Sequence, residues 1–138
     1  MKASLLRFAF VSVFVGLCFS AYAAPPANFT GEYADKDFLN RQGVFQLSLE
    51  QSGNTVSVFF SAVRNDGQGA APDAATTGHV TPKGTVEFKF QDSLNNSGTG
   101  TITRAGDDVV LSIKATRVAD PRCLVFYWQN MKLKPVKK

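Results

Sequence analysis

The stretch GVFQLSLEQSGNTVSVFF, residues 43–60, decides the fold of this chain. Large apolar side chains occupy every second position over 45–49 and again over 56–60, and most positions between them are polar. Such a period of two is the pattern of a β-strand with one dry and one wet face. Gly53-Asn54 separates the two runs and supplies turn residues that tolerate a positive φ, so the stretch predicts an antiparallel hairpin.

The same pattern continues along the chain in both directions. Lys83-Gly84 and Gly106-Asp107 each separate two alternating runs, which predicts two more hairpins. Only the stretch 35–42 suggests a helical turn, which Gly43 would end. The predicted strands lie near 28–33, 43–51, 54–64, 76–81, 85–92, 98–104, 108–116 and 123–133.

Eight short strands joined in sequence form an antiparallel meander, and an open meander exposes two sheet edges. Closing the sheet removes both edges. We therefore predict an all-β chain, an approximately eight-stranded up-and-down barrel. A two-sheet β-sandwich is the alternative, because period and turns do not show whether the first and last strands meet.

The dry faces would place fifteen large residues inside such a barrel, enough to fill most of its interior. A packed barrel places function on its loops or outer surface. The alternative is a cavity that holds one small apolar ligand. The predicted interior residues are Phe29, Tyr33, Phe45, Leu47, Leu49, Val56, Val58, Phe60, Val86, Phe88, Phe90, Ile102, Val109, Leu111 and Ile113.

The opening Gly31-Glu32-Tyr33, followed by a strand, a Gly-Asn hairpin and further meander strands, resembles the layout of lipocalin-like and avidin-like barrels. Those families usually carry a tryptophan near the opening glycine, where this chain has Tyr33. The resemblance therefore implies an up-and-down barrel and carries over no ligand-binding residue.

The N-terminus has the features of a secretory signal peptide. Lys2 and Arg7 precede an apolar run over 8–19, which is shorter than the roughly 20 residues of a membrane-spanning helix. The small-residue motif Ala21-Tyr22-Ala23 then predicts cleavage after residue 23. We expect residues 1–23 to be a signal peptide and residues 24–138 to form one domain, periplasmic or secreted, without a transmembrane segment.

Charge and cysteine content narrow the class of partner. Removing the leader leaves 13 basic residues against 11 acidic ones. Four of the 13 basic residues are lysines in the tail 132–138. The body of the domain is thus slightly acidic, which speaks against a nucleic-acid partner. The mature chain keeps only Cys123, so no internal disulfide can form and the core must stabilise the domain.

No arrangement of residues in the sequence indicates catalysis or a cofactor. His79 is the only histidine and lacks the partners of a zinc site or of a Ser-His-Asp triad. Asp107-Asp108 lies at a hairpin turn where aspartate is favoured, and Asp35-Lys36-Asp37 lacks the other ligands of a calcium loop. We expect a non-enzymatic protein without metal or cofactor, and His79 is either solvated or in contact with a partner.

The strongest anomaly is Cys123 to Trp128, CLVFYW, where alternation fails and both faces of the predicted strand become apolar. Either the leader-proximal segment covers the outer face, or Tyr127 and Trp128 form an exposed interaction patch. Arg117 and Arg122 would then provide a charged rim around the turn at Asp120-Pro121.

The predicted loop from Arg64 to Gly78, which includes Asp66, is the other candidate for partner contact, because loops of this length are often functional or simply mobile. Three hypotheses follow. The first is an exported module that recognises a macromolecular partner, for example as an inhibitor or immunity-type protein. The second is a carrier of a small apolar ligand, and the third is an enzyme of unfamiliar type.

Overall fold

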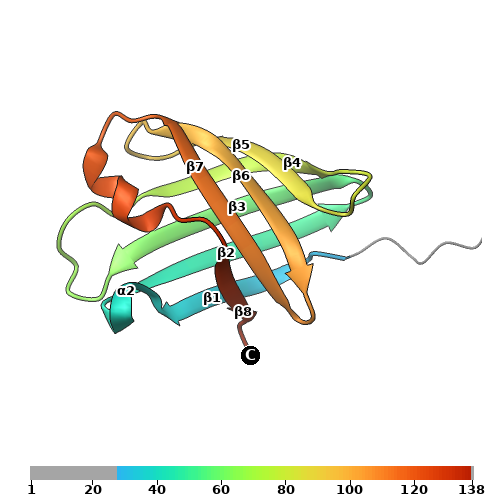
Figure 1. The fold of residues 1–138 in the computed structure, drawn as a ribbon, viewed down its shortest axis with the longest axis horizontal. Helices are drawn as coiled ribbons and strands as arrows, with labels where there is room; N and C mark the ends of the chain where they lie inside the picture. Colours follow the sequence, from blue (N-terminus) through green and yellow to red (C-terminus); the bar gives the residue numbers. More distant parts are fainter. Residues whose placement is uncertain (1–27, 138) are drawn as a thin grey trace, which may run out of the picture.

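The computed structural model describes residues 28–137 and shows a closed antiparallel barrel in which each strand pairs with the next and β8 pairs with β1 (Figure 1). The prediction of an eight-stranded up-and-down barrel is confirmed, and the sandwich alternative is wrong because the first and last strands meet. The elements are β1 (Gly31–Asp37), α2 (Phe38–Arg41), β2 (Gly43–Ser52), β3 (Thr55–Arg64), β4 (Asp73–Val80), β5 (Val86–Gln91), β6 (Ser97–Ala105), β7 (Asp108–Arg117), the 3₁₀ helix η2 (Pro121–Phe126) and β8 (Met131–Pro135).

The predicted signal peptide, residues 1–23, lies outside the described residues. Within residues 28–137, no helix has the length and apolar character needed to cross a membrane.

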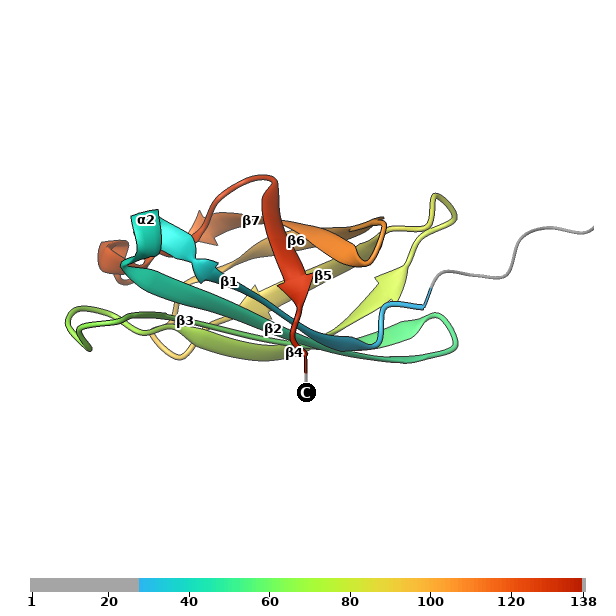
Figure 2. The ribbon, with the colours of Figure 1, turned by 90° about the horizontal axis from the view of Figure 1, so that it is seen from below.

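The barrel is flattened, with β2 and β3 in one layer and β6 and β7 in the other (Figure 2). Its core lies between the layers and contains all fifteen residues that alternation placed inside, none more than 5% exposed. Burial of this apolar surface is the main favourable term in folding. The inward and outward assignment of the strands is therefore confirmed.

The β2–β3 hairpin keeps an unbroken register from Gly43 opposite Arg64 to Ser52 opposite Thr55. Gly53 opens the turn with a φ of 61°, a left-handed conformation that costs a non-glycine residue about 1–2 kcal/mol. The turns predicted at Lys83-Gly84 and Gly106-Asp107 are also present.

The predicted strand over 123–133 is wrong in its first half, because residues 121–126 form η2 and β8 begins only at Met131. Asp120 caps η2 by accepting a hydrogen bond from the backbone N–H of Arg122, and Pro121 follows at the first helical position, where proline is favoured. A 3₁₀ helix repeats every three residues, so Cys123 and Phe126 share one buried face.

Two other strands begin three residues away from their predicted starts. The strand β1 begins at residue 31 instead of 28, and β4 already begins at residue 73, which shortens the predicted 64–78 loop to 65–72. Three of the four inward positions of β4 carry the small or polar residues Ala74, Thr76 and Gly78, so its alternation is weak in the sequence. The helical turn predicted within 35–42 is present at 38–41, but Leu39, Asn40 and Arg41 adopt left-handed φ values of 56°, 56° and 72°.

The two ends of the barrel differ in construction (Figure 1). The three tight hairpin turns lie at one end, which we call the turn end. The other end, which we call the plug end, carries α2, the connections 65–72 and 92–96, and the segment 118–130 that contains η2.

Candidate functional site

The structure gathers six of the seven predicted contact residues at the plug end and leaves one elsewhere. His79 is exposed on β4 towards the turn end, opposite Thr55 of β3, so it does not join the others. The six at the plug end are Arg64, Asp66, Arg117, Arg122, Tyr127 and Trp128.

Aromatic rings fill the interior behind the plug end. The ring centroid of Phe60 lies 5.8 Å from that of Phe45, 5.2 Å from that of Phe90 and 6.0 Å from that of Tyr127. These separations are those of favourable ring pairs. Phe126 from η2 is 1% exposed, so η2 seals this end of the core.

A buried polar latch fastens the segment 118–128 to the connection 92–96. The carboxylate of Asp92, 4% exposed, accepts hydrogen bonds from the backbone N–H groups of Leu94 and Asn96, from Asn96 Nδ2 and from Tyr127 Oη at 2.5 Å. Asn96 Oδ1 in turn accepts from the backbone N–H groups of Ala119 and Asp120, each at 2.8 Å. The segment 118–128, which we call the plug segment, is therefore held in one position.

The pKa values of Tyr127 and Cys123, beside the Asp92 carboxylate, are both raised. Burial raises the pKa of Tyr127 above its ordinary value, and its hydrogen bond to Asp92 raises that pKa further. Burial also raises the pKa of the Cys123 thiol, with a smaller contribution from the charge of Asp92. A buried thiol in its neutral form is a poor nucleophile.

The plug segment presents Trp128 to solvent. Its side chain is 47% exposed, while its indole Nε1 donates a hydrogen bond to the Val125 carbonyl at 2.6 Å and its ring lies 5.4 Å from that of Phe38. Val118 and Leu124, on the same segment, are each 44% exposed. The two residues of the predicted patch therefore differ: the side chain of Tyr127 is half-buried, and that of Trp128 is exposed.

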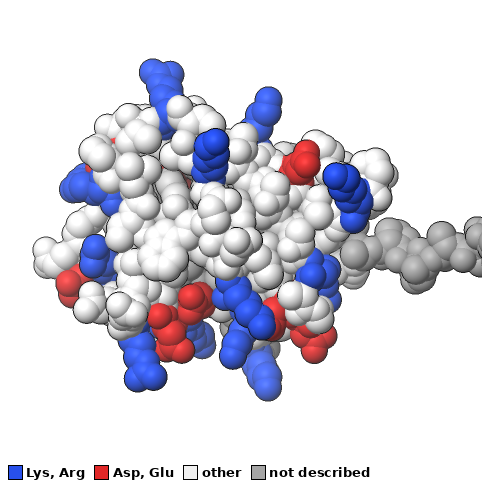
Figure 3. Space-filling model, viewed as in Figure 1, with Lys and Arg blue, Asp and Glu red and all other residues white. Residues whose placement is uncertain are grey.

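Charged side chains lie mostly around the rim of the face that carries η2 and β8, and its middle is uncharged (Figure 3). Arg122 is paired with Asp120, with 2.6 Å between Nη2 and Oδ2. The hydrogen bonds from the Arg122 side chain lower the pKa of Asp120, and those to Asp120 raise the pKa of Arg122. Within residues 28–137, Arg64 and Arg117 form no ion pair.

Sequence reasoning missed Phe38, Asp92 and Asn96. The stretch DSLNN, residues 92–96, does carry a local signal, since aspartate and asparagine form side-chain turns with the backbone two residues on. That signal predicts a turn between β5 and β6. It says nothing of the distant Tyr127, whose hydroxyl completes the latch.

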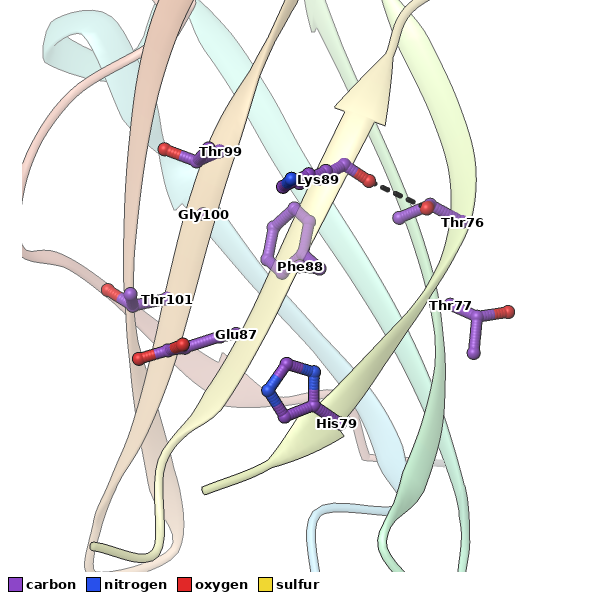
Figure 4. Close-up of a pocket in the computed structure, with 9 residues that line it drawn as sticks. All are labelled: Thr76, Thr77, His79, Glu87, Phe88, Lys89, Thr99, Gly100 and Thr101. Carbon is purple, nitrogen blue, oxygen red and sulfur yellow. Dashed lines mark hydrogen bonds between the residues drawn. The ribbon is translucent and has the colours of Figure 1, made fainter. Parts of the chain in front are cut away.

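His79 lines a separate hollow of about 550 Å³ on the outer face of β4, β5 and β6 (Figure 4). Pairing between β4 and β5 ends at His79 opposite Glu87, and the two strands then diverge. Thr76 Oγ1 bridges them by donating a hydrogen bond to the Lys89 carbonyl at 2.7 Å. The hydroxyls of Thr99 and Thr101 come from the neighbouring strand β6.

The described residues contain no group of three or more His, Cys, Asp and Glu side chains placed to hold a metal ion. Comparison of the chain with protein-family models, with curated proteins and with solved structures gave no match.

Proposed function

We propose that this chain is an exported, non-enzymatic recognition module that binds a protein partner in the cell envelope or outside the cell through its plug end. The observation that carries the proposal is the exposed Trp128 on a segment that the latch and the Phe38 ring hold in place. An inhibitor or immunity-type protein is one form of such a module.

The composition of the plug end agrees with this function. Protein interfaces are enriched in tryptophan and arginine and depleted of charge at their centre, and a few aromatic anchors carry most of the binding energy. Here Trp128 shares its segment with the exposed Val118 and Leu124, and Arg64 and Arg117 lie at the same end. An anchor that is already rigid loses little conformational entropy when it binds.

The alternative of a small-ligand carrier has less support. A carrier needs free volume inside the barrel, whereas rings from β2, β3 and β5 already contact one another there. Native mass spectrometry of the purified protein separates the two hypotheses. A co-purified small molecule in stoichiometric amount would favour the carrier.

The proposal is tested by affinity purification of the tagged protein, expressed with its own leader, from envelope extract and culture medium. We expect one stoichiometric protein partner, with binding lost in Trp128→Ala. Val110→Ala is the matched control, because Val110 is a half-buried apolar residue on the outer face of β7, near the turn end. Equal capture by both variants, or no partner, would contradict the proposal.

Export is tested on the same preparation. Intact-mass measurement should show the loss of residues 1–23, and the protein should fractionate with the periplasm or the medium. An unprocessed chain in the cytoplasm would contradict the proposed location.

A further inference from the structure

Three hollows adjoin one another across the outer face of the barrel. The hollow beside His79 shares Thr76 and Thr77 with a second hollow of about 480 Å³ over β2, β3 and β4. The second shares Ser48 and Phe59 with a third, of about 150 Å³, that reaches β1. We call this continuous row the outer trough. It crosses the strands from β1 to β6.

Phe59 stands in the middle of the trough. Its ring is 44% exposed, and it lines the hollow on either side. Its neighbours are small: Ser48 and Ala75 lie directly opposite on β2 and β4, and Ser57 precedes it on the same face of β3. The ring is therefore accessible along its faces and not shielded by larger side chains.

Most of the polar residues that line the trough carry a hydroxyl group. Ser48 and Ser57 lie near the ring, Thr77 lies beyond it, and Thr99 and Thr101 line the far hollow. Serine is depleted in protein interfaces, where aromatic residues and arginine dominate. The outer trough thus differs in composition from the plug end and suits a hydroxylated ligand better than a protein surface.

The charges that line the trough limit the ligand further. Glu50 and Glu87 contribute carboxylates to the two larger hollows, and Lys89 contributes an ammonium group. This excess of negative charge repels an anionic ligand such as a nucleic acid or an acidic polysaccharide. A neutral ligand avoids that repulsion.

We propose that the outer trough binds a neutral, linear oligosaccharide. A pyranose ring has apolar C–H faces that stack on an aromatic ring, and its hydroxyl edges exchange hydrogen bonds with threonine, serine and carboxylate groups. Phe59 supplies the ring, and Ser48, Thr77 and Glu50 supply polar partners beside it. The inference does not depend on the proposed function of the plug end.

The extent of the trough matches a short chain of sugars. Neighbouring strands lie about 4.8 Å apart, so the hollow over the paired strands β2, β3 and β4 is about 10 Å across, close to the length of two linked sugars. The ligand would run across the strands, with one sugar stacked on Phe59 and the next ones in the hollow that His79 lines (Figure 4).

The test is an NMR titration of the ¹⁵N-labelled protein with four tetrasaccharides: cellotetraose, maltotetraose, the N-acetylglucosamine tetramer and the anionic galacturonic acid tetramer. We expect at least one neutral probe to shift amide signals in 46–50, 57–61, 75–79 and 99–101. The anionic probe should leave them unmoved. Shifts confined to the plug end, or none with any neutral probe, would overturn the proposal.

Variants test the role of the ring. Phe59→Ala should weaken the affinity for the bound probe by at least about tenfold, and Phe59→Trp should retain it, because stacking needs an aromatic face. Val63→Ala is the matched control, since Val63 is 42% exposed on the same face of β3 but lines none of the three hollows. It should bind as the wild type does.

Sedimentation of the same variants addresses a different occupant of the trough. Three results together would assign this face to a second copy of the chain: the wild type self-associates, Phe59→Ala abolishes that association, and no neutral probe binds. The oligosaccharide proposal would then be wrong. A monomeric wild type that binds a neutral probe with the expected ring dependence supports it.

Discussion

The β2–β3 hairpin and the seam that closes the barrel are built in opposite ways. The hairpin pairs along its whole length around a turn opened by Gly53. At the seam, β8 pairs with β7 only where Val109–Leu111 face Met131–Leu133, and with β1 only at Tyr33 and Ala34. The remainder of the seam is covered by η2 and Trp128, whose carbonyl accepts a hydrogen bond from the Ile113 N–H.

The difference is one between local and distant interactions. Hairpin contacts join residues close in sequence, so little loop entropy is lost before they form. The seam joins β1 to β8, which lie at opposite ends of the domain sequence. The latch at the plug end joins Asp92 to Tyr127, which are 35 residues apart. We expect the hairpin to be the more persistent region and the plug segment to open first.

The largest effect is expected from Phe60→Ala, which removes the ring that joins the two regions. Phe60 belongs to the hairpin, yet its ring contacts Tyr127 of the plug segment. Loss of a buried phenylalanine costs about 3–5 kcal/mol. Urea unfolding followed by circular dichroism should show that loss in one cooperative transition. A cost below about 1 kcal/mol would mean that the interior collapses around the gap.

A smaller and more local effect is expected from Asn96→Ala. The change removes the acceptor of the partly buried backbone N–H groups of Ala119 and Asp120. It also removes a donor to the buried Asp92 carboxylate, and loss of that hydrogen bond costs about 1–3 kcal/mol. Hydrogen exchange should accelerate at Ile113 and across 118–130, while amides within 45–49 keep their protection. Uniform acceleration would show that hairpin and seam open together.

The latch should also respond to alkaline pH. The pKa of Tyr127 is raised in the folded state by burial, so the proton is held more tightly there than in the unfolded chain, where tyrosine has a pKa of about 10. The stability from this difference is complete below about pH 10 and is lost as the pH rises above it. Unfolding titrations should show this loss in the wild type and a weaker one in Tyr127→Phe.

The smallest effects are a pair of opposite sign. Gly53→Ala places a side chain at a φ of 61° and should destabilise the hairpin by about 1 kcal/mol. Arg41→Gly removes the backbone strain of an exposed arginine that has a φ of 72°, and it should stabilise the folded state by up to about 1 kcal/mol. Thermal unfolding of both variants checks the pair. Destabilisation by Arg41→Gly would show that its side chain contributes more than the strain costs.

The candidate site was predicted in part, and partly for the wrong reason. Tyr127 and Trp128 stood out because alternation fails there, and they do lie together at the plug end. The failure marks a 3₁₀ helix, however, and not a strand with two apolar faces. Phe59 escaped notice because one extra apolar residue inside a strand pattern carries no signal of its own exposure or neighbours.

By itself, the sequence determined which side chains point inward, where the three tight turns lie and that the strands follow one another as a meander. Those properties depend on neighbours within one or two strands, where the period of two and the turn residues act directly. Only the tertiary structure decided that β8 meets β1, that the Asp92 carboxylate reaches Tyr127 and that two hollows meet at Phe59. These depend on the twist and curvature of the whole sheet, which bring together residues that no local pattern relates.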